Sequence, residues 1–139
     1  YKRQVVGVST LAACALSAQA LKVNPHVIAC FDARMGELYL GAYECEPGSA
    51  NAVLCDGLFK PDALPELPCA EWMIVGSGLV YQDALRAAYG ASFCVADAHP
   101  RAQAVAQLAL PAFERGEGVS AEQAQPVYLR DQVIQGAVR

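Results

Sequence analysis

The chain has 139 residues, of which 55% are hydrophobic and 17% charged, so one folded domain with an ample core is expected and intrinsic disorder is excluded. Its net charge is −4, and no basic run is longer than Lys2-Arg3. Because proteins that hold nucleic acid through its phosphates need concentrated positive charge, direct binding of tRNA or DNA is not expected.

The N-terminal segment allows two interpretations. A basic pair followed by the uncharged residues 4–21 is the pattern of an export signal or a lipoprotein leader. Gly7 and Ser9 interrupt that apolar run, and the same stretch predicts a short buried strand over residues 5–8, a helix N-cap at Ser9 and an alanine-rich helix over residues 11–22. We favour the folded interpretation, in a cytoplasmic protein, and no segment is apolar for long enough to span a membrane.

Three antiparallel strands are predicted next. Residues 26–32 and 37–45 are rich in β-branched and aromatic side chains, and a short turn with Gly36 at positive φ joins them into a hairpin. A Pro-Gly turn over residues 46–49 then leads into a third strand over residues 52–58.

Helices and strands alternate in the following part of the chain. Pro61 suits the first turn of a short helix, and residues 71–75 form an apolar strand. The Gly-Ser-Gly turn at residues 76–78 opens a helix that Gly90 ends, and residues 92–95 predict another strand.

The last predicted helix begins at Pro100, buries Val105 and Leu108 on one face, and is capped by Gly116. Pro111 lies inside it and predicts a kink or an early end, and the tail is expected to be irregular. Three antiparallel strands followed by alternating helices and strands predict an α/β fold with a mixed sheet flanked by helices.

No set of side chains suited to catalysis is evident. The six cysteines form no C-x-x-C motif and several lie in apolar runs, so we interpret them as buried thiols in a reducing compartment. His26 and His99 belong to no metal-binding motif, neither is paired with an acid, and Ser77 lacks the spacing of a G-x-S-x-G elbow. Neither a catalytic residue nor a metal or cofactor is predicted.

Three segments resemble the TsaB family, also called YeaZ, of tRNA-modification factors. They are Gly-Val-Ser-Thr-Leu at residues 7–11, Asp-Ala-Arg-Met-Gly-Glu-Leu-Tyr at residues 32–39 and Pro-Val-Tyr-Leu-Arg at residues 126–130. The resemblance follows the family's order over nearly the whole chain, and it implies an RNase-H-like lobe of the actin, sugar-kinase and Hsp70 superfamily.

The resemblance also implies a domain organisation. Residues 1–24 would be the junction from the end of a first lobe, residues 25–119 the second RNase-H-like lobe, and residues 120–139 a C-terminal tail. The family's N-terminal lobe is missing, so we expect the sequence to be a fragment.

The function implied by the resemblance is that of a non-catalytic scaffold or activator in the synthesis of threonylcarbamoyladenosine on tRNA. The implied partners are the catalytic paralogue TsaD and the ATPase TsaE, with the TsaD contact weakened when the first lobe is absent, and a homodimer stays open. Tyr128, Leu129 and Arg130 are candidates for docking on the first lobe, on TsaD or on the domain itself, and the sequence does not choose among these.

The alternative is a weak nucleotide-binding or hydrolytic enzyme of the same superfamily, consistent with the glycoprotease label of some relatives. Its candidate residues lie in the hairpin corner and in the Gly-rich turn: Asp32, Arg34, Gly36, Gly76, Ser77 and Gly78. A simpler interpretation of the corner is that Asp32 and Gly36 satisfy turn geometry while Arg34 pairs with Asp32 or Glu37, and we favour it.

Overall fold

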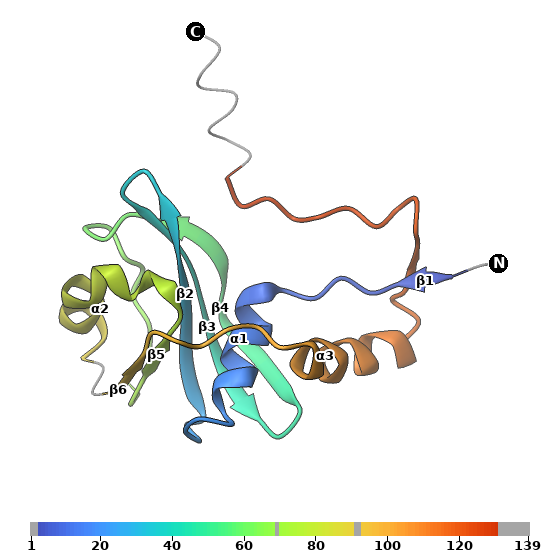
Figure 1. Cartoon of the computed structure of the whole chain (residues 1–139), viewed down its shortest axis with the longest axis horizontal. Coiled ribbons are helices and arrows are strands. Elements are labelled where there is room, and N and C mark those ends of the chain that lie inside the picture. Colours follow the sequence, from blue (N-terminus) through green and yellow to red (C-terminus); the bar gives the residue numbers. More distant parts are fainter. Residues whose placement is uncertain (1–2, 69, 91–92, 131–139) are drawn as a thin grey trace, which may run out of the picture.

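The computed structural model describes residues 3–68, 70–90 and 93–130 (Figure 1). Lys2, Cys69, Ser92 and residues 131–139, which figure in the expectations above, lie outside the described residues. In chain order the elements are β1 (Gln4–Val5), α1 (Thr10–Ala18), β2 (His26–Arg34), β3 (Glu37–Glu46), β4 (Ser49–Phe59), β5 (Met73–Val75), the 3₁₀ helix η1 (Ser77–Tyr81), α2 (Gln82–Tyr89), β6 (Phe93–Val95), α3 (Ala102–Glu114) and β7 (Val119–Ser120).

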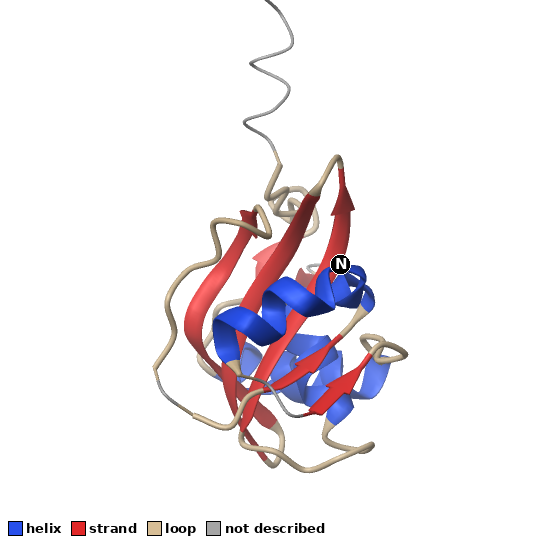
Figure 2. Cartoon of the chain, turned by 90° about the vertical axis from the view of Figure 1, so that its left-hand side faces the viewer, coloured by secondary structure: helices blue, strands red, loops and turns tan. Residues whose placement is uncertain are grey.

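The centre of the molecule is a five-stranded sheet in the order β4-β3-β2-β5-β6. Strands β2, β3 and β4 pair antiparallel, and β5 and β6 continue the sheet parallel to β2. Figure 1 views the sheet nearly edge-on, with α2 on one side and α1 on the other, and Figure 2 shows the strands side by side. This arrangement confirms the predicted α/β class, with a mixed sheet of three antiparallel strands followed by alternating strands and helices.

Both faces of the sheet are buried because side chains alternate along each strand. Val27 and Ala29 of β2 pack in the cluster that contains α1, whereas Ile28 and Cys30 pack in the cluster that contains Leu85 of α2. All of these side chains are fully buried. The sheet therefore supports a core layer on each side.

Helix α1 belongs to the core. Ser9 is the predicted N-cap, and its Oγ accepts a hydrogen bond from the amide of Ala12 at 3.1 Å. Seven of the nine helical residues are buried, so the apolar stretch that resembles an export signal is here part of the packed domain. The helix ends at Ala18, earlier than predicted, because the Gln19 side chain bonds both the amide and the carbonyl of Asn24 and so closes a turn.

Two predicted elements were wrong. Residues 5–8 do not form a buried strand: Gln4 and Val5 form β1, which is exposed and whose one partner among the described residues is β7, beyond the edge of α3 in Figure 1. A two-stranded ribbon buries little of either strand. The short helix predicted at Pro61 is a turn instead, in which the amide of Ala63 donates to the carbonyl of Lys60 at 3.0 Å, because further prolines follow too closely for a helix to propagate.

Helix α3 packs mainly against α1, with a smaller contact to strand β4 of the sheet. Its contact is Ala104, which lies with Ala13 and Leu16 of α1, and Leu108 packs beside them. Val105, predicted to be buried, is 38% exposed. The residue of α3 that faces α1 is instead Ala104, whose small side chain lets the two helices approach. The helix continues through Pro111 to Glu114, so the early end considered above is wrong. None of the helices in the described part of the chain is long and apolar enough to cross a membrane.

Most of the described cysteines are buried thiols. Cys14, Cys30 and Cys45 are buried and Cys94 is half-buried, but Cys55 is exposed, against the expectation for it. All of these cysteines are unpaired. Burial raises the pKa of the Cys14 and Cys30 thiols from 9.0 to about 12.

This pKa difference predicts an alkaline loss of stability. Below pH 9 both states keep the thiol protons, but above it the unfolded chain releases them while the folded protein does not, so stability falls as the pH rises from 9 towards 12. Each thiol should lower the free energy of unfolding by about 1 kcal/mol at pH 10. Urea unfolding in a reducing buffer between pH 7.5 and 10.5 measures this, and Cys14→Ala should give a flatter pH profile. An unchanged slope in that variant would contradict the assignment.

Candidate functional site

The two sequence segments proposed for nucleotide binding lie side by side. The amide of Asp32, near the end of β2, donates to Ser77 Oγ at 3.1 Å, which joins the hairpin corner to the Gly-Ser-Gly turn. The sequence therefore predicted residues that the fold brings together, although they are 45 positions apart.

The glycines of this turn have a packing role. Gly76 has φ of +106°, and a Cβ there would overlap the carbonyl oxygen of Cys30. A Cβ at Gly78 would lie 2.7 Å from the Cys30 sulfur. Both glycines are buried, and only Ser77 between them is exposed. The close approach of η1 to β2 therefore accounts for both glycines without a ligand.

The hairpin corner is a strained turn that its own residues stabilise. Arg34, Met35 and Gly36 all have positive φ, of 64°, 55° and 74°, a region that side chains other than glycine rarely adopt. The Asp32 carboxylate accepts a hydrogen bond from the backbone amide of Arg34 at 2.9 Å. Asp32 and Gly36 thus serve turn geometry, as the simpler interpretation proposed.

Arg130, almost a hundred positions later in the chain, binds the backbone of this corner. Its guanidinium donates to the carbonyl of Ala33 at 2.7 Å and to that of Arg34 at 3.2 Å, and forms an ion pair with Glu37 at 3.0 Å. The expected pairing of Arg34 with Asp32 or Glu37 was wrong, because Glu37 pairs with Arg130 and Asp32 binds the backbone amide of Arg34 instead of its side chain. Both partners of the ion pair are mostly buried. Two of the three segments that resemble the TsaB family are in direct contact here.

The residues before Arg130 form an extended segment, residues 125–130, which we call the strap. Leu129 packs against the core cluster on the α1 side of the sheet, whereas Tyr128 is 66% exposed. Leu129 and Arg130 are thus docked on this domain itself. Figure 1 shows the chain after β7 running back over the domain towards the β2–β3 hairpin.

A polar cluster that sequence reasoning missed lies at the start of α1. The Asp56 carboxylate of β4 accepts hydrogen bonds from the hydroxyls of Ser9 and Tyr43, whose own oxygens are 3.4 Å apart. Burial and the hydrogen bond to Asp56 raise the pKa of Tyr43, so its hydroxyl stays protonated as a donor. The one signal in the sequence was that Asp56 is the single charge in the long strand β4.

This cluster borders a cavity beside the strap. The cavity has a volume of about 810 Å³ and lies among the start of α1, the strands β2, β3 and β4, and the strap. Its walls are mainly apolar and aromatic, and its charged side chains are Asp56 and Arg130. A cavity of this size and character is typical of a binding site.

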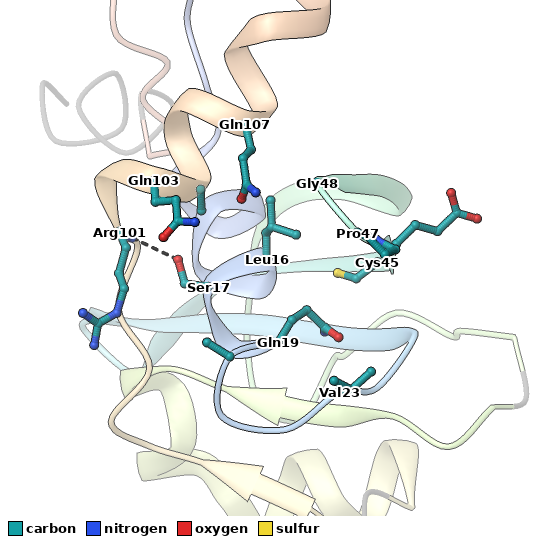
Figure 3. Close-up of a pocket in the computed structure, with 13 residues that line it drawn as sticks. Leu16, Ser17, Gln19, Val23, Cys45, Pro47, Gly48, Arg101, Gln103 and Gln107 are labelled. Carbon is teal, nitrogen blue, oxygen red and sulfur yellow. Dashed lines mark hydrogen bonds between the residues drawn. The ribbon is translucent and has the colours of Figure 1, made fainter.

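The second cavity, of about 390 Å³, lies among α1, the β3–β4 turn and the start of α3 (Figure 3). Gln19, Gln103 and Gln107 line it, and the amide of Arg101 donates to Ser17 Oγ at 3.0 Å across its end. The wall also contains Glu46 and Arg101, and most of its surface is apolar, so its glutamine amides offer hydrogen bonding around a mainly apolar hollow.

The histidines have acidic neighbours, contrary to expectation, but stand apart from both cavities. His99 Nε2 lies 2.9 Å from Asp97, with both side chains exposed, and His26 lies 3.7 Å from Glu44. Ser77 makes no hydrogen bond with either histidine. Within residues 3–68, 70–90 and 93–130, no group of three His, Cys, Asp or Glu side chains could hold a metal ion.

Comparisons with known proteins identify relatives of this fold. No family model matches the chain. The chain is 32% identical over 136 residues to the tRNA threonylcarbamoyladenosine biosynthesis protein TsaB of Escherichia coli K12. This match covers 93% of this chain and 58% of that protein.

Two solved structures of proteins from Pseudomonas aeruginosa are also similar. YeaZ is 34% identical with a TM-score of 0.76, and a protein described as similar to the peptidase YEAZ is 35% identical with a TM-score of 0.78. The matches cover 91% and 92% of this chain and 60% of each of those chains. The chain thus spans less than two thirds of the length of these relatives. On this sequence and structural similarity, the chain belongs to the TsaB (YeaZ) family.

Proposed function

We propose that this protein takes part in the biosynthesis of threonylcarbamoyladenosine on tRNA, as a non-catalytic scaffold that acts through contacts with other proteins. The observation that carries the proposal is its 32% identity to Escherichia coli TsaB along 93% of the chain. The proposed partners are TsaD, the catalytic paralogue, and the ATPase TsaE, in the cytoplasm.

The non-catalytic role is supported by how the polar groups of the described residues are engaged. Ser9 and Tyr43 donate to Asp56, Ser77 accepts from the backbone of Asp32, and Arg130 binds turn carbonyls. These contacts tie elements of the fold to one another. A nucleophile, base and orienting acid do not converge among the described residues, as chemistry of that type requires.

We further propose that a first lobe covers one end of this domain in the longer protein. Apolar side chains on α3 and on the β1–β7 ribbon are exposed: Val5 at 39%, Val105 at 38%, Leu110 at 56%, Phe113 at 54% and Val119 at 38%. Such a group of exposed apolar side chains is typical of a covered interface. The relatives have the additional length that a further lobe needs, since this chain matches 58–60% of them.

Co-purification with TsaD tests the scaffold proposal. We expect the longer protein to retain TsaD strongly and residues 1–139 alone to retain it weakly, because the first lobe should supply most of the contact. The matched readout is formation of threonylcarbamoyladenosine in a reconstituted reaction with and without the longer protein. A reaction that is equally fast without it, together with no retention of TsaD, would refute the proposal.

The alternative function is nucleotide binding at the corner where Asp32 meets Ser77, and its support is that the fold places the two candidate segments side by side. Calorimetry of the longer protein with ATP or ADP and magnesium tests it. The informative variant is Ser77→Ala, because Ser77 is exposed, whereas a side chain at Gly78 would clash with Cys30 and disturb the fold itself. Tight, saturable binding that Ser77→Ala weakens would favour the alternative.

A further inference from the structure

We propose that the 810 Å³ cavity beside the strap receives the guanidinium group of an arginine side chain from another polypeptide, with Asp56 as its ionic partner. The proposal rests on the carboxylate at the wall of this cavity, on the aromatic side chains around it, and on the balance of charge inside it.

Asp56 is held in place to act as a receptor. Its two carboxylate oxygens accept hydrogen bonds from Ser9 and Tyr43, one each. A carboxylate can accept about four hydrogen bonds, so capacity remains on the side that lines the cavity. Gly41 leaves room for this carboxylate, because a Cβ there would overlap Asp56 Oδ1 and the Tyr43 hydroxyl. The carboxylate is therefore oriented before a ligand arrives.

The cavity lacks the cation that such a carboxylate needs. Among the described residues Asp56 forms no salt bridge. The other charged residue in the wall is Arg130, whose guanidinium is already engaged by Glu37 and by the carbonyls of Ala33 and Arg34. A half-buried carboxylate without a cation is unfavourable, so the cavity is electrostatically complementary to a positive ligand.

Aromatic side chains favour arginine over lysine. Phe31 of β2, Tyr39 and Tyr43 of β3 and Tyr128 of the strap all line the same cavity. A planar guanidinium stacks on aromatic faces and pairs with a carboxylate through two parallel hydrogen bonds, and it is less strongly hydrated than an ammonium. A phosphate or other anion would be repelled by Asp56. An arginine side chain from a protein partner matches both features of the wall.

The assignment of this arginine to a protein partner rests on the proposed scaffold function. The test of the arginine site needs only the purified chain. Labelled residues 1–139 are titrated with N-acetyl-L-arginine N-methylamide and followed by NMR. We expect saturable shifts at Ser9, Asp56 and Tyr128 with a dissociation constant in the millimolar range, about −4 kcal/mol. The citrulline analogue, which has nearly the same shape without the charge, should bind about tenfold more weakly.

Two variants make the test specific. Asp56→Asn removes the charge while its one carbonyl oxygen still accepts from one of the two hydroxyls of Ser9 and Tyr43 and its NH2 group donates to the oxygen of the other, and it should weaken binding about tenfold. Glu46→Gln removes one negative charge beside the other cavity and should leave binding unchanged. If Asp56→Asn fails to fold, Tyr128→Ala serves instead, because that side chain is 66% exposed and its loss should weaken binding without disturbing the core.

The proposal is overturned if the arginine probe gives no saturable shifts, if the citrulline analogue binds equally well, or if Asp56→Asn binds as the parent does. Because TsaD is absent from this experiment, failure here would leave the co-purification result standing. Failure to retain TsaD would likewise leave the binding of the arginine probe intact.

Discussion

Replacing Gly76 with alanine is expected to lower the free energy of unfolding by about 4 kcal/mol or more, the largest effect that we predict for a single methyl group. The backbone there has φ of +106°, which a side chain rarely adopts, and the new Cβ would overlap the carbonyl oxygen of Cys30. Cys30 lies in the central strand β2, so the clash can be relieved only by moving η1 away from the sheet.

The matched control is Gly90→Ala. Gly90 ends α2 with φ of +61°, also in the left-handed region, but no atom lies within 4 Å of the Cβ position. This change should cost only about 1 kcal/mol, the conformational penalty by itself. Urea unfolding of both variants at pH 7.5 measures the difference. Equal losses of stability would show that contact with Cys30 carries no energy beyond backbone strain.

The second large effect is expected for Arg130→Ala, which should lower the free energy of unfolding by about 2–3 kcal/mol. The change removes two hydrogen bonds to turn carbonyls and the ion pair with Glu37, and both charged side chains are mostly buried. It also leaves Glu37 without its cation, which adds a penalty because that carboxylate is only 21% exposed.

Hydrogen exchange separates this role from a general loss of stability. In Arg130→Ala the amides of the strap and of the hairpin corner, Arg34 to Gly36, should exchange faster, while those of β5 should change only in proportion to global stability. Val127→Ala is the control, because that side chain is 86% exposed and should contribute little. Unchanged protection in the strap of Arg130→Ala would mean that Leu129 alone holds it in place.

The sheet was predictable because its signals are local. The β2–β3 hairpin follows from two strand-forming runs around Gly36, and Leu38 and Leu40 alternate with tyrosines as one buried face requires. Ser9 as an N-cap and Gly90 as a C-cap are equally local, since each acts on residues within a few positions along the chain.

The errors arose where burial depends on a neighbour. Residues 5–8 are as apolar as a core strand, yet β1 pairs with β7 and is exposed. The face of α3 was assigned from its most hydrophobic side chains, but Ala104 makes the contact with α1 while Val105 is exposed. Helical periodicity predicts that a face exists, and the packed neighbour decides which residues it contains.

The candidate sites show the same division. The sequence by itself determined the α/β class, the hairpin turn at Gly36 and the Gly-Ser-Gly turn, because propensity, periodicity and turn chemistry act over a few residues. Only the tertiary structure decided that Arg130 would bind the carbonyl of Ala33, 97 positions earlier, and that Ser9, Tyr43 and Asp56 would meet at one cavity. Such contacts depend on the positions of whole elements in space, and no local pattern in the chain encodes which distant side chains will meet.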